Sequence, residues 1–285
     1  MIRRALILGA GGPAASSWAT GVIAGLADQG IDIRNADLFV GTSAGSRVAA
    51  QITSGQGLEE LFERQLQPQP VGGVAVKVDF KKLKADYVRA KEGDGGDIGF
   101  LKRMGSLAVN APTVSEADTL KEVASRLLVD AWPVQRVLAV AVDTETGERR
   151  AFDRSSGVPL RDAVAASGAA PGMSPAITIE GHRYMDGGVY STDNADLAMG
   201  FERVLILTLK AGFPSTCVVS LDAAVERLER SGSQVVTVRP DDATEAAFAA
   251  VGGNLLDPKV QDGAARAGRE QGRRIAALNV AAVWN

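Results

Sequence analysis

The sequence predicts an α/β protein built on a mainly parallel sheet, because short apolar runs alternate with segments of helical spacing. Residues 4–8 are predicted to form a buried strand, and residues 16–29 a helix that Gly30 ends. A second apolar run, residues 37–40, leads directly into a small-residue helical segment over 44–52. Two strands that alternate with two helices in this way lie parallel in one sheet.

The remaining elements continue this alternation after one interruption. A helix is predicted over residues 58–65, the pattern breaks at Gln67, and it returns at Ser115. The elements then predicted are a helix over 120–129, a strand over 136–142 with a hairpin partner over 148–152, a helix over 160–167, a hairpin of 176–179 and 182–185, strands over 204–209 and 235–238 around a helix over 220–229, and a final helix from 258 to about 283.

The interrupted stretch, about residues 66–114, is expected to be a cap or lid inserted into a single domain of 285 residues. Residues 74–104 carry eight basic side chains against five acidic ones, in a chain whose net charge is −3. Residues 79–91 predict an amphipathic helix, and the glycine-rich residues 93–97 predict a mobile loop. The helix could rest on an anionic membrane surface, or it could be an ordinary helix packed on the core with a solvated lysine face. Its lysines include Lys81, Lys82 and Lys84.

Composition excludes several classes of protein. With 46% hydrophobic and 23% charged residues, the chain is neither disordered nor collagen-like, and its negative net charge does not indicate nucleic-acid binding. The apolar run that follows Arg3 and Arg4 reaches Gly9 too soon for a signal-peptide core, and no later run is long enough to span a membrane. The single cysteine, Cys217, excludes an internal disulfide framework and suits a reducing cytoplasm, where we expect the protein. We expect Cys217 to be a small buried apolar residue.

The strongest chemical signal is Gly41-Thr42-Ser43-Ala44-Gly45, placed between a predicted strand and a predicted helix. Glycines two residues before and after the serine remove the Cβ atoms that would clash in a sharp strand-to-helix turn. We expect this nucleophile elbow to expose the Ser43 hydroxyl and to point the Ala44 N–H at a developing oxyanion. The alternative is an ordinary glycine-serine turn.

A second signal is the turn Gly9-Ala10-Gly11-Gly12-Pro13 at the end of the first strand. Its glycines can turn backbone N–H groups toward an anion, either a phosphate or the oxyanion of an acyl-transfer reaction. The dinucleotide fingerprint needs a third glycine where Ala14 stands, and no P-loop lysine follows, so nucleotide binding is the weaker interpretation. A plain structural turn also remains open.

A third signal is Asp186-Gly187-Gly188, directly after a predicted strand. An aspartate that leaves a strand before two glycines lies at a sheet edge where no side chain shields it. It is a candidate base. The alternative is a turn, for which Asp-Gly is a common pair.

These three motifs occur in order, each at a strand end, and here the sequence resembles the patatin-like phospholipase family, serine lipid acyl hydrolases that use a Ser-Asp dyad without histidine. The resemblance covers nearly the whole chain. It includes Ser167-Gly168-Ala169-Ala170-Pro171-Gly172 before the aspartate and Asn194-Ala195-Asp196-Leu197-Ala198 after it. It implies a three-layer α/β/α fold with a mainly parallel central sheet, and no cofactor or catalytic metal.

Residue by residue, the resemblance implies Ser43 as nucleophile, Asp186 as its base, and the N–H groups of Gly11 and Gly12 as oxyanion donors. A lipid or fatty-acyl ester is then the substrate. The cap, residues 66–114, is not part of the resemblance, and peripheral membrane contact through it is expected only from its lysine-rich helix. Many members close a fuller glycine run with Arg-Gly or another glycine, where this chain has Pro13-Ala14-Ala15. A non-catalytic lipid-binding or regulatory protein on the same scaffold is therefore the alternative. Headgroup, acyl chain, transacylation and oligomeric state are not readable from the sequence.

The histidine count bears on the same question. His182 is the only histidine, so it would have to be the base of any Ser-His-Asp triad, and a site with two histidine ligands within one chain is excluded. In an extended strand four residues span roughly 13 Å. If Asp186 contacts Ser43, His182 is therefore too far away to bridge them, which favours the dyad.

Overall fold

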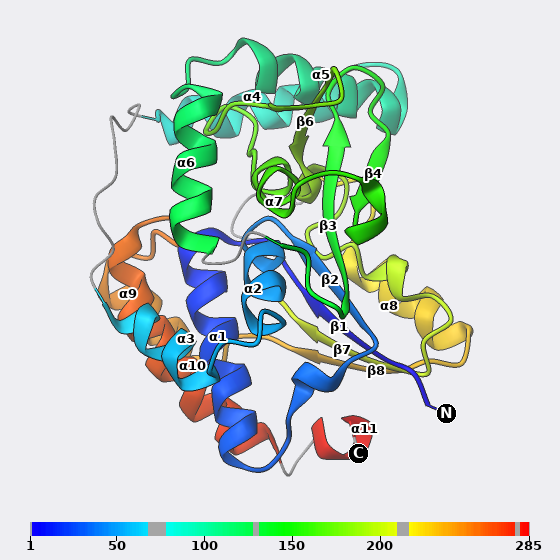
Figure 1. Ribbon diagram of the computed structural model, residues 1–285. Coiled ribbons are helices and arrows are strands. Elements are labelled where there is room, and N and C mark those ends of the chain that lie inside the picture. The colour runs from blue at the N-terminus through cyan, green and yellow to red at the C-terminus, as the bar shows by residue number, and fades with distance from the viewer. Residues whose placement is uncertain (1, 68–77, 128–130, 210–216, 277–279, 285) are drawn as a thin grey trace.

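The computed structural model describes residues 2–67, 78–127, 131–209, 217–276 and 280–284. Within these ranges, eight strands form one sheet in the order β5-β6-β3-β2-β1-β7-β8, and β4 pairs with β3 (Figure 1). Strands β1, β2, β3, β7 and β8 are parallel, whereas β4 and β6 run antiparallel to β3, and β5 antiparallel to β6. This confirms the mainly parallel sheet. The strands are β1 (Arg4–Leu8), β2 (Leu38–Thr42), β3 (Arg136–Asp143), β4 (Arg149–Phe152), β5 (Ile177–Ile179), β6 (His182–Asp186), β7 (Arg203–Leu207) and β8 (Gln234–Val238).

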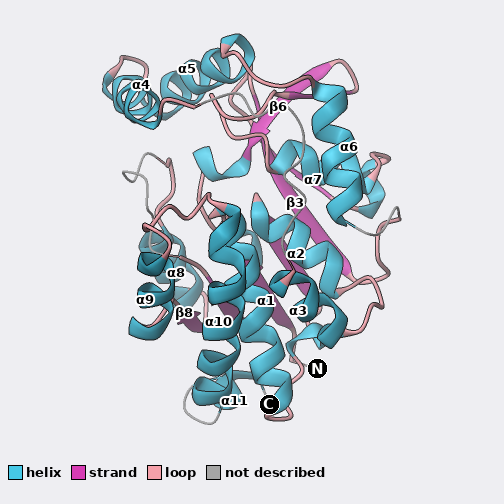
Figure 2. Ribbon diagram, turned by 90° about the vertical axis from the view of Figure 1, so that its left-hand side faces the viewer, coloured by secondary structure: helices cyan, strands magenta, loops and turns pink. Residues whose placement is uncertain are grey.

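Helices cover both faces of the sheet. Alternate residues of β1 face opposite sides, because successive side chains of a strand point in opposite directions: Leu6 packs with α1, α2 and α10, and Ile7 packs with α8 (Figures 1 and 2). The three layers predicted from the resemblance are therefore present. The helices are α1 (Gly12–Asp28), α2 (Ala44–Ile52), α3 (Leu58–Leu66), α4 (Phe80–Glu92), α5 (Gly96–Asn110), α6 (Glu116–Leu127), α7 (Leu160–Ser167), α8 (Leu221–Arg230), α9 (Asp242–Ala250), α10 (Gln261–Ile275) and α11 (Ala281–Trp284).

Helix α1, which follows the glycine-rich turn, is clamped by α10. A Cβ atom on Gly25 of α1 would lie 2.0 Å from the Arg269 carbonyl oxygen, and one on Gly272 of α10 would lie 2.3 Å from the Val22 carbonyl oxygen. The two backbones can therefore approach closely only with glycine at both positions. This packing fixes α1 along its length, and with it the glycine-rich turn at its N-terminus.

The most important feature of the sheet for the candidate site is that β2 and β6 share one edge of β3. Ala139 and Val140 of β3 pair with β2 and with β4, whereas Ala141 and Val142 pair with β6 and with β4. A strand has only two edges, so β2 and β6 must follow one another along the edge opposite β4. Since β2 is parallel and β6 antiparallel to β3, their C-terminal ends meet there.

Within the stretch where the sequence predicts a cap, the two helices α4 and α5 pack together at one end of the sheet (Figure 2). Leu83 and Tyr87 of α4 and Phe100 of α5 share a core cluster with Met185 of β6, so these helices rest on the strand ends. The expected loop over 93–97 is instead a tight turn, because Gly95 adopts a left-handed conformation and α5 begins at Gly96. Residues 68–77 of the predicted cap lie outside the described residues.

Two helices, α5 and α9, were not predicted by the sequence pattern. Helix α5 contains three glycines and helix α9 contains five alanines, so their apolar faces are narrow. Within the predicted final helix, α10 covers Gln261–Ile275 and α11 covers Ala281–Trp284, and residues 277–279 between them lie outside the described residues. Among the helices of the described ranges, none combines the length and the apolar character that a membrane span requires.

Candidate active site

Ser43 lies on the turn between β2 and α2, as the sequence predicts. Its backbone has φ 55° and ψ −121°, a conformation that costs a non-glycine residue about 1–3 kcal/mol. The turn is tight: a Cβ atom on Gly45 would lie 2.0 Å from the Leu8 carbonyl oxygen, and one on Gly41 would lie 2.4 Å from the Ser46 Cα. The Ser43 N–H donates to the Ser167 hydroxyl at 3.0 Å. The turn therefore holds a strained serine at a helix N-terminus, with its side chain partly exposed.

Asp186 is the last residue of β6, so its carboxyl group lies where β6 meets the end of β2. It is buried, with 6% of its surface exposed. Burial raises the pKa of this carboxyl group to about 6, while the Ser43 hydroxyl and the Gly188 N–H, as hydrogen-bond donors, oppose the rise. The Gly188 N–H donates to Asp186 Oδ1 at 2.7 Å. A carboxylate with a pKa near 6 is ionised at neutral pH and is a stronger base than an exposed aspartate.

The glycine-rich turn lies beside these two residues. Gly11 has φ 145° and Gly12 has φ 61°, conformations that favour glycine, and Gly12 begins α1. The neighbouring N–H groups are engaged: Ala10 donates to the Thr192 carbonyl oxygen at 2.9 Å and Ala14 donates to a carbonyl oxygen of the 254–256 loop at 3.2 Å. Among the described residues, none accepts a hydrogen bond from the N–H of Gly11 or Gly12. These donors remain available to an anion.

Ala44 supplies a third N–H at the same place. It is the first residue of α2, where a helix leaves its N–H groups without intrahelical acceptors and carries a partial positive charge. Gly11 and Gly12 line the same cavity as Ser43, and Ala44 directly follows Ser43 in the chain. N–H groups of this kind suit an oxygen that gains negative charge.

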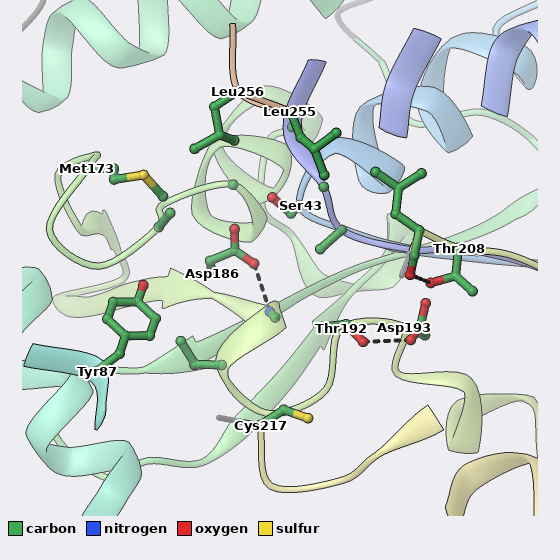
Figure 3. A pocket seen from close by; sticks show the side chains of 18 of the residues that line it. Ser43, Tyr87, Met173, Asp186, Thr192, Asp193, Thr208, Cys217, Leu255 and Leu256 are labelled. Carbon is green, nitrogen blue, oxygen red and sulfur yellow. Dashed lines mark hydrogen bonds between the residues drawn. The ribbon is translucent and has the colours of Figure 1, made fainter. Parts of the chain in front are cut away.

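A cavity of about 810 Å³ contains these groups (Figure 3). Ser43 and Asp186 face its interior, and Met173 and Tyr87 lie on its cap side. Burial raises the pKa of Tyr87, and its hydroxyl donates to the Pro171 carbonyl oxygen at 3.1 Å, so this ring is a fixed wall. Further lining residues include Gly11, Gly12, Phe80, Gly188, Val189, Leu209, Leu255, Leu256 and Arg239.

Cys217 also lines the cavity, and it is half-buried rather than buried as expected. It lies after residues 210–216, which are outside the described residues, in the segment that follows β7. The expectation was wrong because burial of a lone cysteine in a loop depends on which elements pack around it.

His182 lies at the opposite end of β6 from Asp186. Its Nδ1 is 3.0 Å from Asp143 Oδ2, and 58% of its side chain is exposed. The same Asp143 carboxylate accepts from the N–H groups of Glu145 and Thr146 at 2.8 Å each, so it closes the turn between β3 and β4. His182 does not line the cavity. In the part of the chain that the structure describes, no group of three histidine, cysteine or carboxylate side chains could hold a metal ion.

Two further residues near the site, Asp193 and Asn194, were not predicted to have a role in it. Asp193 lies beside the glycine-rich turn: it is 1% exposed, burial raises its pKa, and the Thr192 hydroxyl donates to its Oδ2 at 2.6 Å. Its Oδ1 is buried without a partner among the described residues. Asn194 is fully buried and left-handed, with φ 49°. The only signal for Asp193 was its position, seven residues after Asp186 in a polar run, whereas Asn194 begins one of the segments that carry the family resemblance.

The family model of the patatin-like phospholipases matches residues 6–199. This range is more than half of the 285 residues and contains the glycine-rich turn, the Ser43 turn and Asp186. The chain belongs to the patatin-like phospholipase family. Membership implies a lipid acyl hydrolase, the function predicted from the resemblance.

Other comparisons add little to this patatin-like assignment. The comparison with curated protein sequences gives no match. Among solved structures, VipD from Legionella pneumophila is similar at 11% identity and a TM-score of 0.49, over 97% of this chain and 67% of that one. The type III effector ExoU is similar at 12% identity and a TM-score of 0.42, over 98% of this chain and 54% of that one. The chain thus spans about two thirds of VipD and about half of ExoU.

Proposed function

We propose that this patatin-like chain hydrolyses carboxylic ester bonds of lipids, with Ser43 as nucleophile and Asp186 as base. The observation that carries the proposal is the meeting of β2 and β6 along β3, which brings a strained serine and a buried carboxylate into one cavity. The N–H groups of Gly11 and Gly12, from which no described residue accepts, complete the set of groups that acyl transfer requires.

In the first half of the reaction, the substrate carbonyl oxygen lies among the N–H groups of Gly11, Gly12 and Ala44. Ser43 Oγ attacks the carbonyl carbon while its proton passes to the Asp186 carboxylate. The tetrahedral oxyanion is stabilised by donors that are already oriented, so no reorganisation is needed. When this intermediate collapses, the C–O bond to the leaving alcohol breaks, Asp186 returns the proton to that oxygen, and the acyl group remains on Ser43.

In the second half, water replaces the alcohol. Asp186 takes a proton from this water, whose oxygen attacks the acyl-enzyme carbonyl, and the proton then returns to Ser43 Oγ as the fatty acid leaves. A carboxylate is a weak base toward a serine hydroxyl, so burial is needed to strengthen it. The raised pKa of Asp186 supports this role.

We further propose that α4 contacts the membrane beside the cavity mouth. Phe80 begins α4, lines the cavity and is 43% exposed, and Val88 is exposed at 36%. Successive residues of a helix turn by 100°, which places Lys81 and Lys84 on the same outward face as these apolar side chains. Lys82 instead pairs with Asp86 at 2.9 Å. An apolar and cationic face suits an anionic bilayer surface.

The decisive experiment is covalent labelling of the purified protein with a fluorophosphonate, together with hydrolysis of a short-chain p-nitrophenyl ester. We expect label on Ser43 in the wild type, and neither label nor hydrolysis in Ser43→Ala. Ser125→Ala, which removes an exposed serine hydroxyl on α6, is the matched control and should behave as wild type. An unlabelled, inactive wild type would favour a lipid-binding or regulatory protein instead. A lipidomic comparison of extracts treated with wild type and Ser43→Ala would identify the natural ester.

A further inference from the structure

No strand ladder joins the two halves of the candidate dyad. The pairing of β2 with β3 ends at Val140, and the pairing of β6 with β3 begins at Ala141, so β2 and β6 meet end to end without hydrogen bonds of the sheet between them. Their common partner β3 brings the Ser43 turn and the Asp186 turn together, and direct contacts between the two turns then refine their separation. Those contacts act where an error of about 1 Å can cost a hundredfold in rate.

One side chain bridges this junction directly. The amide nitrogen Nδ2 of Asn194 donates to Thr42 Oγ1 at 3.0 Å and to the Ser191 carbonyl oxygen at 2.8 Å, and it lies 3.4 Å from the Gly187 carbonyl oxygen. Thr42 precedes Ser43, and Gly187 follows Asp186. A single amide thus contacts the residues next to the nucleophile and next to the base.

The orientation of this amide is itself fixed. Asn194 Oδ1 accepts from Arg149 Nη1 at 3.1 Å, so the nitrogen must face the junction. Arg149 is held in turn by two hydrogen bonds of 2.7 Å to Asp196, and its guanidinium lies 4.4 Å from the centre of the Tyr190 ring. The bridge is therefore braced from β4 on its far side.

The backbone shows that the position suits asparagine in particular. Asn194 is left-handed, with φ 49° and ψ 35°, a conformation that asparagine tolerates better than other residues with a Cβ atom. Its exposed fraction is 0%. Local partners could have satisfied the hydrogen-bonding groups of a buried amide. The Asn194 amide instead contacts two segments that are distant in sequence, at Thr42 and at Gly187.

Two hydrogen bonds from backbone N–H groups to the end of α7 and to the residues that follow it also hold the two turns. The Ser43 N–H donates to the Ser167 hydroxyl, and the Asp186 N–H donates to the Ala169 carbonyl oxygen at 2.9 Å. These hydrogen bonds hold the backbones of the two turns. The Asn194 amide holds the adjoining residues, so all these contacts together leave little freedom between Ser43 and Asp186.

We propose that Asn194 is a positioning residue that holds the Ser43 turn and the Asp186 turn at the separation that proton transfer requires. The inference rests on the proposed function of these two residues. It predicts that loss of the amide, or of its acceptor on Thr42, lowers the rate of Ser43 attack without changing the cavity that binds the ester.

The test compares Thr42→Val, which replaces the acceptor hydroxyl with a methyl group of similar size, with Thr42→Ser, which keeps the hydroxyl. Asn194→Gly is the companion variant, because glycine keeps the left-handed backbone and removes the amide. The matched control is Thr244→Val: Thr244 is also fully buried, and its hydroxyl also has side-chain partners, Asp241 and Gln271, but it lies on α9 outside the cavity lining.

We expect Thr42→Val and Asn194→Gly to lower kcat and the rate constant of fluorophosphonate labelling by about tenfold to a hundredfold, with KM within about twofold. Thr42→Ser should recover most of this loss. The acid limb of the kcat/KM profile should move below pH 6 in Thr42→Val, because a looser Asp186 turn admits water to the carboxylate. Thr244→Val should lose stability and keep both kcat and the pH midpoint.

The outcomes are separable. A wild type that neither labels nor hydrolyses esters overturns the proposed function before the variants are compared. The wild type could instead be active while Thr42→Val has the same kcat and pH midpoint as Thr244→Val. That result overturns only the positioning role of Asn194. If Asn194→Gly does not fold, the Thr42→Val and Thr42→Ser pair decides the matter, because those changes leave the backbone and the volume nearly intact.

Discussion

Replacing Asp186 with asparagine should make the protein more stable at neutral pH while it removes activity. The carboxylate is buried, and burial raises its pKa from the ordinary 3.8 to about 6. Each pKa unit corresponds to about 1.4 kcal/mol, so the ionised carboxylate destabilises the native state by about 3 kcal/mol above pH 6. The asparagine of the Asp186→Asn variant is neutral at every pH, and its side-chain oxygen can still accept from the Gly188 N–H.

The sign of the pH dependence follows from proton uptake. Between pH 4 and pH 6 the native state binds a proton on Asp186 that the unfolded chain has released, so the contribution of Asp186 to wild-type stability falls as pH rises through this window. Asp186→Asn lacks this proton, whereas all other titrating groups are shared by the two proteins. Their difference in unfolding free energy should therefore be small at pH 4 and reach about 3 kcal/mol by pH 7.

Urea unfolding of both proteins at half-unit steps between pH 4 and pH 8 measures this difference, and kcat/KM measured over the same steps gives the functional counterpart. As pH is lowered, Asp186 is protonated and can no longer act as a base, so wild-type kcat/KM should fall with a midpoint near pH 6. Asp186→Asn, which cannot accept the proton, should lose at least about a hundredfold. A variant that is less stable than wild type at pH 7, or a stability difference that does not change with pH, would refute this reasoning.

The remaining predictions concern the histidine and the cap. His182→Gln should keep activity within about tenfold of wild type and cost at most about 1 kcal/mol of stability, because it loses only the hydrogen bond between this exposed side chain and Asp143. If the ester assay instead showed a loss of activity as large as that expected for the base of a triad, the dyad would be contradicted. The double change of Lys81 and Lys84 to glutamate should weaken co-sedimentation with anionic vesicles by on the order of 1 kcal/mol per lysine, with soluble-ester hydrolysis nearly unchanged. The control is the double variant Lys121→Glu and Arg154→Glu, which makes the same change in charge outside residues 66–114. If both double variants bound anionic vesicles equally well, α4 would be an ordinary packed helix.

The sequence alone determined the parts of this protein that depend on local geometry. The bounds of β1, α2 and α7 agree with the predicted ranges, because apolar runs and helical spacing act within a few residues of one another. Glycine spacing around Ser43 likewise required a sharp turn, and the close contacts at Gly41 and Gly45 show why only glycine fits there. The family resemblance, carried by three motifs in order, was confirmed by the match over residues 6–199.

Only the tertiary structure determined how the motifs lie relative to one another and which contacts join them. Ser43 and Asp186 are far apart in sequence, and the register of β2 and β6 on one edge of β3 cannot be read from either strand alone, because register depends on which strands pair. The raised pKa of Asp186 is a property of its surroundings. The Asn194 amide shows the same principle. The family resemblance includes its position, but its acceptors on Thr42 and Gly187 come together only after the sheet has formed, so the sequence could not show what it contacts.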